Sequence, residues 1–276
     1  MNKLFALRNV WTEDDVRFLS KYGISRKEKD CKSVIINDGP IYEELHAHFF
    51  KKSEHPLYEE AFGFEYTESE VLSSEYCLLF FLSGRGYPQP EDGYSYRKQV
   101  YDMSKYCDYC GQEKVQIGDY GIISPPRRSM WTYTAWVFDA VFVTETLYED
   151  VFKPLGIGWR HVNKKSGKVF EGVLQLDIPV LDENLDLSMF EYEICPVCGR
   201  KKYGAKFHVP FFSQPLHPLP HMFFTKEYFG YGGSANRKLI ITTELAKKLI
   251  DMKLIRLKDL IPCRSNYSEY LKTINY

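Results

Sequence analysis

Two short cysteine motifs constrain the fold of this 276-residue chain more than any other feature. Residues 107–111 read CDYCG and residues 195–199 read CPVCG. Two residues between the cysteines let both thiolates reach one metal ion, and the glycine accepts the left-handed backbone of a tight turn. Two such motifs supply the four soft ligands of a closed tetrahedral zinc site. We therefore predict one structural Zn²⁺ per chain, bound by Cys107, Cys110, Cys195 and Cys198.

The long stretch between the two motifs determines what such a metal would do. It exceeds the length of a compact zinc ribbon, so the ion would staple distant parts of the chain together. A closed tetrathiolate site has no open coordination position, so it would stabilise the fold rather than activate water. A redox-active CxxC pair and plain packing without metal are the alternatives; neither motif opens a clear helix, which a thioredoxin-like unit would require.

The region that carries the motifs repeats itself. VFVTETL at residues 141–147 is echoed by LIITTEL at residues 239–245. In each copy an apolar strand runs into a threonine that can cap a following helix. A chance match of a common strand–helix unit is the alternative, but the shared CxxCG motif favours duplication. We predict an α+β fold with mixed sheets and short helices, and two zinc-knuckle-containing repeats in the C-terminal two thirds.

The N-terminal third reads as a separate α/β region. Thr12 is a candidate N-cap for a helix that ends at Gly23, and the apolar run Tyr76–Leu82 predicts a buried strand. The glycine- and proline-rich segment Gly84–Gly93 predicts a loop. We therefore expect a first domain over residues 1–100 and a duplicated, zinc-stapled domain over residues 101–276.

Charge and cysteine usage limit the function classes. The 36 Lys and Arg residues balance 37 Asp and Glu residues, so no basic excess drives general binding to phosphate backbones. Seven cysteines are an odd number, which argues for a reducing compartment. No apolar run is long enough for a signal-peptide core or a membrane span. We expect a cytoplasmic protein without a membrane partner.

Signatures of catalysis are scarce, and we expect no enzyme. GxxxxGK[ST], GxGxxG, HExxH and GxSxG are all absent from the sequence. Two histidine groups could offer a second metal site, but neither comes with a matching carboxylate pattern, which favours ordinary turn or surface residues. An enzyme with a cysteine or histidine centre is the remaining alternative, built on Cys31, Cys77 or one of these histidines. The first group is His46, His48 and His55, and the second is His208, His217 and His221.

A cluster of cations follows the second motif directly. Arg200, Lys201, Lys202 and Lys206 could contact nucleic acid beside a zinc knuckle, which makes a zinc-ribbon-type nucleic-acid-binding protein the alternative function. The interpretation we favour is that these cations offset the negative charge of a zinc tetrathiolate.

The two motifs and their strand–helix phrases resemble the bacterial double-CXXCG-motif proteins. The resemblance covers about residues 100–262 and includes the phrases at 165–168 and 174–179. It implies the role of an immunity protein that binds and neutralises a cognate toxin protein in the cytoplasm. It also implies that the four motif cysteines are zinc ligands.

Two aromatic segments are candidate toxin-contacting surfaces, because tyrosine and tryptophan are favoured anchors of tight interfaces. They are Tyr87–Tyr101 and Arg127–Trp136. If the toxin is a nuclease, Glu91, Asp92 and Asp119 could occupy its basic cleft. An ordinary loop and a strand pair are the alternative interpretations of the two segments.

Overall fold

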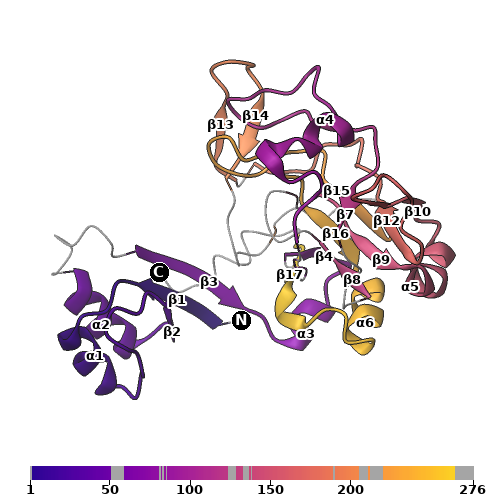
Figure 1. Ribbon diagram of the computed structural model, residues 1–276. Helices are drawn as coiled ribbons and strands as arrows, with labels where there is room; N and C mark the ends of the chain where they lie inside the picture. The colour runs from indigo at the N-terminus through magenta and orange to yellow at the C-terminus, as the bar shows by residue number, and fades with distance from the viewer. Residues whose placement is uncertain are drawn as a thin grey trace. The chain divides into compact units, whose positions relative to one another are not determined.

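The computed structural model combines helices with several small sheets, which confirms the predicted α+β class (Figure 1). The chain divides into two compact units, the first within residues 1–70 and the second from residue 71 onward. The structure describes residues 2–50, 59–80, 82, 84, 86–123, 129–132, 137, 139–188, 190–204, 211 and 220–264.

The N-terminal unit is a three-stranded antiparallel sheet with two helices. Strand β1 is central, between β2 and β3. Helix α1 begins after Thr12, as predicted, because the Asp15 backbone N–H donates to Thr12 Oγ1 at 3.2 Å while the Thr12 N–H donates to Asp15 Oδ2 at 3.0 Å. The elements are β1 (Asn2–Arg8), α1 (Glu13–Ser20), β2 (Val34–Asn37), α2 (Pro40–Phe50) and β3 (Glu59–Glu65). The core contains Phe5, Leu7, Trp11, Leu19, Val34, Leu45 and Phe49.

The second unit contains two four-stranded antiparallel sheets of matching design. The first has the strand order β10-β12-β9-β8 and the second β17-β4-β16-β15. The first is made of β8 (Met130–Trp131), β9 (Phe142–Thr144), β10 (Gly158–Arg160) and β12 (Val173–Asp177). The second is made of β4 (Tyr76–Leu79), β15 (Met222–Phe224), β16 (Leu239–Thr242) and β17 (Leu260–Pro262).

The predicted strand–threonine–helix unit is confirmed in both sheets. Thr144 ends β9, and its Oγ1 accepts a hydrogen bond from the Leu147 N–H at 3.4 Å. Thr242 ends β16, and its Oγ1 accepts one from the Leu245 N–H at 3.3 Å. Each threonine thus caps the helix that follows it. These helices are α5 (Glu145–Leu147), continued by a π-helical turn η2 (Tyr148–Phe152) and a 3-10 turn η3 (Lys153–Leu155), and α6 (Thr243–Asp251).

One inner strand of the second sheet, β4, comes from a distant part of the chain, whereas the first sheet lies entirely between the two motifs. Strand β4 precedes the first CxxCG motif, yet it pairs with β16, which follows the second motif. Strand β12 lies between the motifs and pairs with β9. The register is equivalent, with Tyr76 opposite Thr242 and Val173 opposite Thr144. Because β4 is built into the second sheet, the N-terminal unit ends earlier in the chain than the boundary expected near residue 100.

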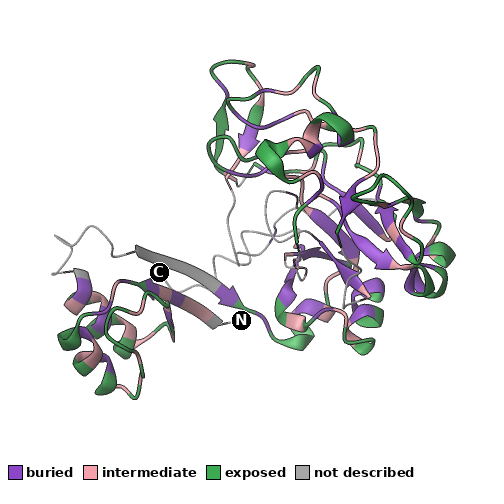
Figure 2. Ribbon diagram, in the orientation of Figure 1, coloured by how far each residue is buried: buried purple, intermediate pink, exposed green. Residues whose placement is uncertain are grey.

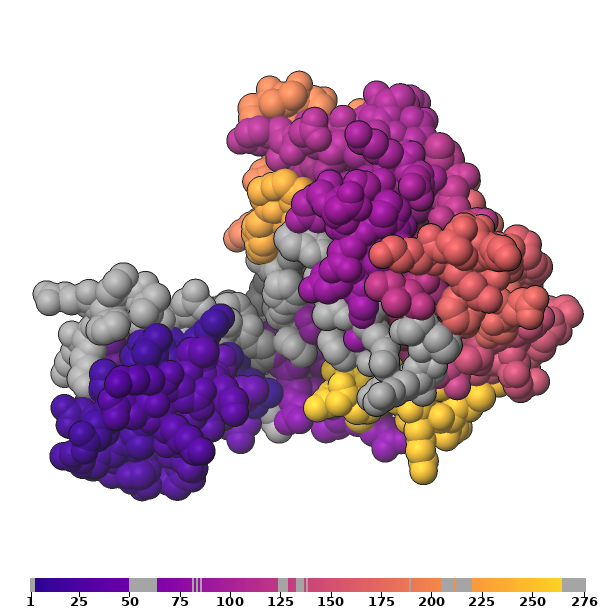
Figure 3. Space-filling view, in the orientation of Figure 1, coloured from indigo at the N-terminus to yellow at the C-terminus, as the bar shows by residue number. Residues whose placement is uncertain are grey.

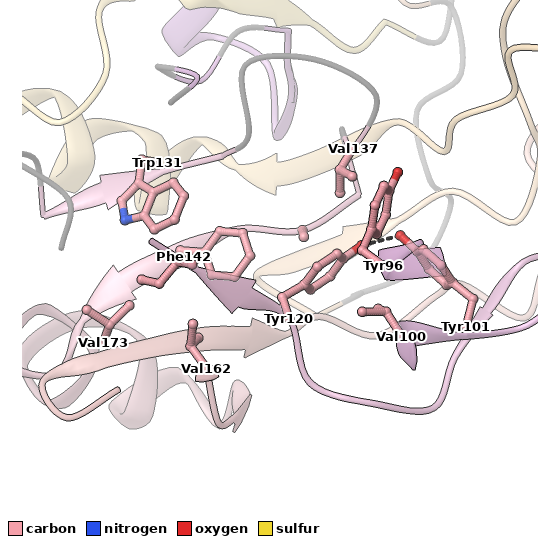
Figure 4. Close-up of a cluster of buried hydrophobic side chains, with 11 residues drawn as sticks. Tyr96, Val100, Tyr101, Tyr120, Trp131, Val137, Phe142, Val162 and Val173 are labelled. Carbon is pink, nitrogen blue, oxygen red and sulfur yellow. Dashed lines mark hydrogen bonds between the residues drawn. The ribbon is translucent and has the colours of Figure 1, made fainter. Parts of the chain in front are cut away.

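Most residues of the two sheets are buried, with β10 as an exception (Figure 2). Around the first sheet, Trp131 stacks on Phe142 with ring centroids 4.4 Å apart, and the hydroxyl groups of Tyr101 and Tyr120 are hydrogen-bonded (Figure 4). The remaining strands form three two-stranded sheets: β5 (Tyr101–Asp102) with β6 (Val115–Gln116), β7 (Gly121–Ile122) with β11 (Asn163–Lys164), and β13 (Tyr192–Ile194) with β14 (Lys201–Tyr203). The short helices are α3 (Glu68–Leu72), η1 (Asp92–Tyr94), α4 (Tyr96–Val100) and η4 (Leu257–Asp259).

Candidate metal centre

The four cysteines of the two CxxCG motifs form one cluster, as predicted. The Sγ atoms of Cys107 and Cys195 lie 3.8 Å apart, those of Cys110 and Cys198 lie 3.7 Å apart, and all four lie within 4.8 Å of one another. Sulfur atoms bound to a tetrahedral zinc ion at about 2.3 Å are separated by about 3.8 Å. A disulfide would require about 2.05 Å. The spacing therefore fits a shared metal ion.

The segments that carry the two motifs lie side by side (Figures 1 and 3). Each motif forms the same turn. The Gly111 N–H donates to the Cys107 carbonyl at 2.7 Å, and the Gly199 N–H donates to the Cys195 carbonyl at 2.9 Å. Both glycines have positive φ angles, of 79° and 71°. A Cβ atom at Gly111 would lie 2.2 Å from the carbonyl oxygen of Gly233, so only glycine fits there.

Backbone hydrogen bonds prepare the first cysteine of each turn to be a thiolate. Backbone hydrogen bonds from Cys110, and more weakly from Tyr109, lower the pKa of Cys107 despite desolvation. Burial works against the charged form of Cys195 too, but hydrogen bonds from the backbone of Cys198 and Val197 lower its pKa to about 6. Burial raises the pKa of Cys110 to about 12. Thiolate is the form that binds metal, so the turns provide ligands before any ion contributes its own charge.

The donor set fits a closed structural site. Cys107, Cys110 and Cys195 are buried and Cys198 is half-buried. Four thiolates complete a tetrahedron without water, and sulfur selects soft or borderline ions such as Zn²⁺. When bound, the ion would supply four bonds that join the two repeats. Among the described residues, this is the one group of Cys, His, Asp and Glu side chains with ligand spacing.

Lys202 is the cation most closely tied to the cluster. Its side chain is completely buried, and its Nζ donates to the carbonyl oxygens of Cys110 at 3.2 Å, of Ser234 at 3.3 Å and of Gly232. Glu193 Oε1 lies 3.1 Å from the same Nζ. The ammonium group thus fixes the main chain of the first motif, and Glu193 balances its charge. The sequence grouped Lys202 with surface cations; only its place in the β13–β14 hairpin shows that it points inward.

Two neighbouring cations, Lys201 and Arg200, also make contacts within the fold. Lys201 Nζ lies 4.1 Å from the ring centroid of Tyr192, and Arg200 donates to the carbonyl of Lys105 at 3.0 Å. Lys206 lies outside the described residues. This arrangement does not favour the nucleic-acid-binding alternative.

Among the described residues, the other predicted candidates do not form a second metal-binding group. Cys31 is exposed, whereas Cys77 and Cys263 are buried in the second sheet region. His48 stacks on Phe18 at 3.7 Å. His46 packs near Tyr42 with ring centroids 5.6 Å apart, and His221 Nδ1 lies 3.3 Å from Thr242 Oγ1. His55, His208 and His217 lie outside the described residues.

Several aromatic residues of the two candidate contact segments are buried in the core, where the structure describes them. In Tyr87–Tyr101, Tyr96 and Tyr101 are buried in the cluster of Figure 4, while Tyr87 and Tyr94 are exposed. In Arg127–Trp136, residues 130–132 are buried, and 127, 128 and 133–136 lie outside the described residues. Glu91 and Asp92 are exposed and Asp119 is half-buried.

Comparisons with known proteins leave the site as the main guide to function. No family model matches the chain, and neither a curated protein nor a solved structure shows significant similarity. Within the described part of the chain, none of the helices has the length and apolar character needed to cross a membrane.

Proposed function

We propose that the protein is a zinc-stapled immunity protein that binds and neutralises a cognate bacterial toxin in the cytoplasm. The observation that carries the proposal is the cysteine cluster, which joins the two CxxCG repeats through four protein ligands. This pairing of motifs is the feature that resembles the double-CXXCG-motif proteins. Such a site leaves no coordination position for a substrate, so the metal supports a scaffold rather than a reaction.

The wider structure is in keeping with a binding role. Its surface carries isolated large apolar residues such as Tyr109, Tyr192 and Val197, which are 59%, 55% and 69% exposed. Tyrosine is enriched at interface hot spots. An immunity protein acts by occupancy, at one copy per toxin, and needs no catalytic group. We therefore propose that the chain is not an enzyme.

Co-expression tests this role directly. The chain would be produced in a bacterial host together with the toxic domain encoded beside its gene, and growth would be followed on induction. Protection from growth arrest and a one-to-one complex on size-exclusion chromatography with light scattering are expected. The matched control is Cys195→Ser, which removes a metal ligand and leaves the surface otherwise unchanged. Failure of the parent chain to protect against any neighbouring toxin would contradict the immunity role.

A further inference from the structure

Strand β10 differs from the other edge strands of the two large sheets. Along β15, the Phe224 N–H donates to the Pro179 carbonyl at 2.8 Å, and Phe224 accepts from the Leu181 N–H at 2.8 Å. Along β17, the Phe211 N–H donates to the Pro262 carbonyl at 3.2 Å. At the end of β8, Gly84 forms a parallel bridge with Thr132. Other residues of the same chain thus pair with each of these three edges.

Among the residues that the structure describes, none pairs with the outer edge of β10. Residues 158–160 pair with β12 on one side, and no backbone hydrogen bond from the described residues reaches the other side. The strand lies at the margin of its sheet (Figure 1). Matching registers make β10 the counterpart of β17, since Trp159 lies opposite Leu176 as Leu260 lies opposite Leu79. An open edge presents unpaired N–H and C=O groups that another strand can use.

The side chains at the β10 edge offer an apolar contact to a partner and do not block access to the strand. Trp159 is 43% exposed, and its counterpart Leu260 is 2% exposed. The ring of Tyr148 supports Trp159 from the interior at 6.5 Å, and exposed His161 meets its edge at 4.8 Å. A half-exposed, laterally supported tryptophan is the kind of residue that anchors a partner.

Charge indicates what kind of segment would fit. Residues 158–170 contain Arg160, Lys164, Lys165 and Lys168 and no Asp or Glu. Asp177 neutralises Arg160 across the strand at 2.9 Å, while the three lysines are exposed on the turn that follows β10. The chain therefore passes from β10 directly into a positively charged hairpin, which attracts an acidic partner and repels a basic one.

We propose that β10 is a docking edge for an extended, acidic segment of a partner protein, which adds a strand to the first sheet. Phe211 shows such edge pairing within this chain. Its N–H donates to the Pro262 carbonyl of β17, and its own carbonyl accepts from the Arg264 N–H at 2.8 Å. On β10 the incoming segment places an apolar residue against Trp159 and carboxylates beside Lys164, Lys165 and Lys168. The proposal rests on the proposed function in taking the partner to be a toxin protein.

A defined peptide tests the edge without the toxin. The probe is a short synthetic peptide that alternates glutamate with valine, and it is compared with the matching lysine–valine peptide. Hydrogen exchange of the full chain should show new protection at residues 158–161 with the glutamate peptide. Binding should be about tenfold or more tighter than for the lysine peptide and should weaken with added salt. An N-methylated glutamate peptide, which lacks strand N–H donors, should lose the protection.

Variants distinguish specific binding at the β10 edge from non-specific binding of the peptide. Trp159→Ala should weaken binding of the glutamate peptide about tenfold, and Lys164→Glu/Lys165→Glu/Lys168→Glu should abolish it. Met252→Ala is the matched control, because Met252 is 42% exposed and lies at the end of α6. Equal binding of both peptides, no binding, protection elsewhere than 158–161, or full binding by Trp159→Ala would overturn the proposal.

Growth protection in co-expression reports on the immunity role separately. If Trp159→Ala loses peptide binding and still protects fully, toxin docking at β10 is overturned and the immunity role stands. If the parent chain binds the peptide at β10 but protects against no neighbouring toxin, the immunity role is overturned and the docking edge stands.

Discussion

The Lys202 ammonium group donates a hydrogen bond to the main-chain carbonyl of Cys110 at 3.2 Å, although 92 positions separate the two residues. This bond joins the second repeat to the metal-binding turn of the first. It uses a main-chain oxygen rather than a cysteine sulfur, so it gives the cluster a second connection that needs no metal coordination.

We predict that Lys202→Met destabilises the protein by about 2–4 kcal/mol, because buried carbonyl oxygens lose their donor. The control is Lys201→Met, at the next position of β14, whose exposed side chain should matter by about 1 kcal/mol or less. Urea unfolding monitored by circular dichroism measures both. Equal effects of the two substitutions would contradict the assigned role of Lys202.

Metal analysis should return one zinc per chain. Cys198→Ser should lower the free energy of unfolding by several kcal/mol, because binding free energy at a structural site is folding free energy. Cys31→Ser, at an exposed position outside the cluster, should change neither the zinc content nor the stability. Elemental analysis and thermal unfolding check both variants, and less than half an equivalent of zinc in the parent would refute a shared site.

Alkylation at pH 8 should sort the cysteines into three groups. Burial raises the pKa of Cys77 to about 11 and raises that of Cys263 well above its ordinary value, so neither forms thiolate. Cys31, which is exposed, should react in the native protein. In the cluster, Cys107 and Cys195, whose pKa values are lowered, should react once the metal is chelated. Cys110, like Cys77 and Cys263, should react only after denaturation, because burial raises its pKa to about 12. Intact-mass spectrometry counts the labels; early labelling of the cluster in metal-loaded protein would speak against metal protection.

The two capping threonines, Thr144 and Thr242, should contribute equally to the stability of the protein. Thr144→Ala and Thr242→Ala should each cost about 1 kcal/mol, because each leaves a helix N–H without its acceptor. Thr144→Ser and Thr242→Ser keep the hydroxyl and should retain most of the stability. Chemical denaturation of the four variants provides the test, and an alanine variant as stable as its serine counterpart would show that the cap is dispensable.

Stability should depend on pH through Lys238. Burial lowers its pKa to about 8 from an ordinary 10.5, so between these pH values the unfolded chain holds more protons than the folded one. The cost of burying the ammonium is therefore fully present below pH 8 and disappears as pH rises toward 10.5. We therefore compare the free energy of unfolding of Lys238→Met with that of the parent at two pH values. The difference in favour of the variant should be up to about 3 kcal/mol larger at pH 7 than at pH 10.5. A pH-independent difference between the two proteins would contradict this assignment.

Local signals carried most of what the sequence could predict. The CxxCG turns and the Thr144 and Thr242 caps are encoded within a few residues, so spacing alone identified the four cysteines that cluster and both helix starts. The burial of Lys202 ran against the general rarity of buried lysine and depended on hairpin register, which the sequence did not reveal. Tyr96 and Tyr101 likewise showed aromatic character without showing that they face the core.

The pairing of β4 with β16 and β17 had no sequence signal at all. Each strand is a short apolar run, and strand partners are chosen by packing over long separations rather than by neighbouring residues. The domain boundary expected after the Gly84–Gly93 loop depended on this missing information, because β4 was assigned to the N-terminal region.

The placement of β4 has a consequence during synthesis. All four residues of β4 are buried in the folded protein. Their partner strand β16 is translated roughly 160 residues later, a delay on the order of ten seconds. Until then the nascent chain carries an apolar strand without its partner, which is open to pairing with other chains. The second CxxCG motif also emerges late. A truncated chain would therefore lack both β16 and half of the thiolates, so zinc retention would distinguish finished molecules from incomplete ones.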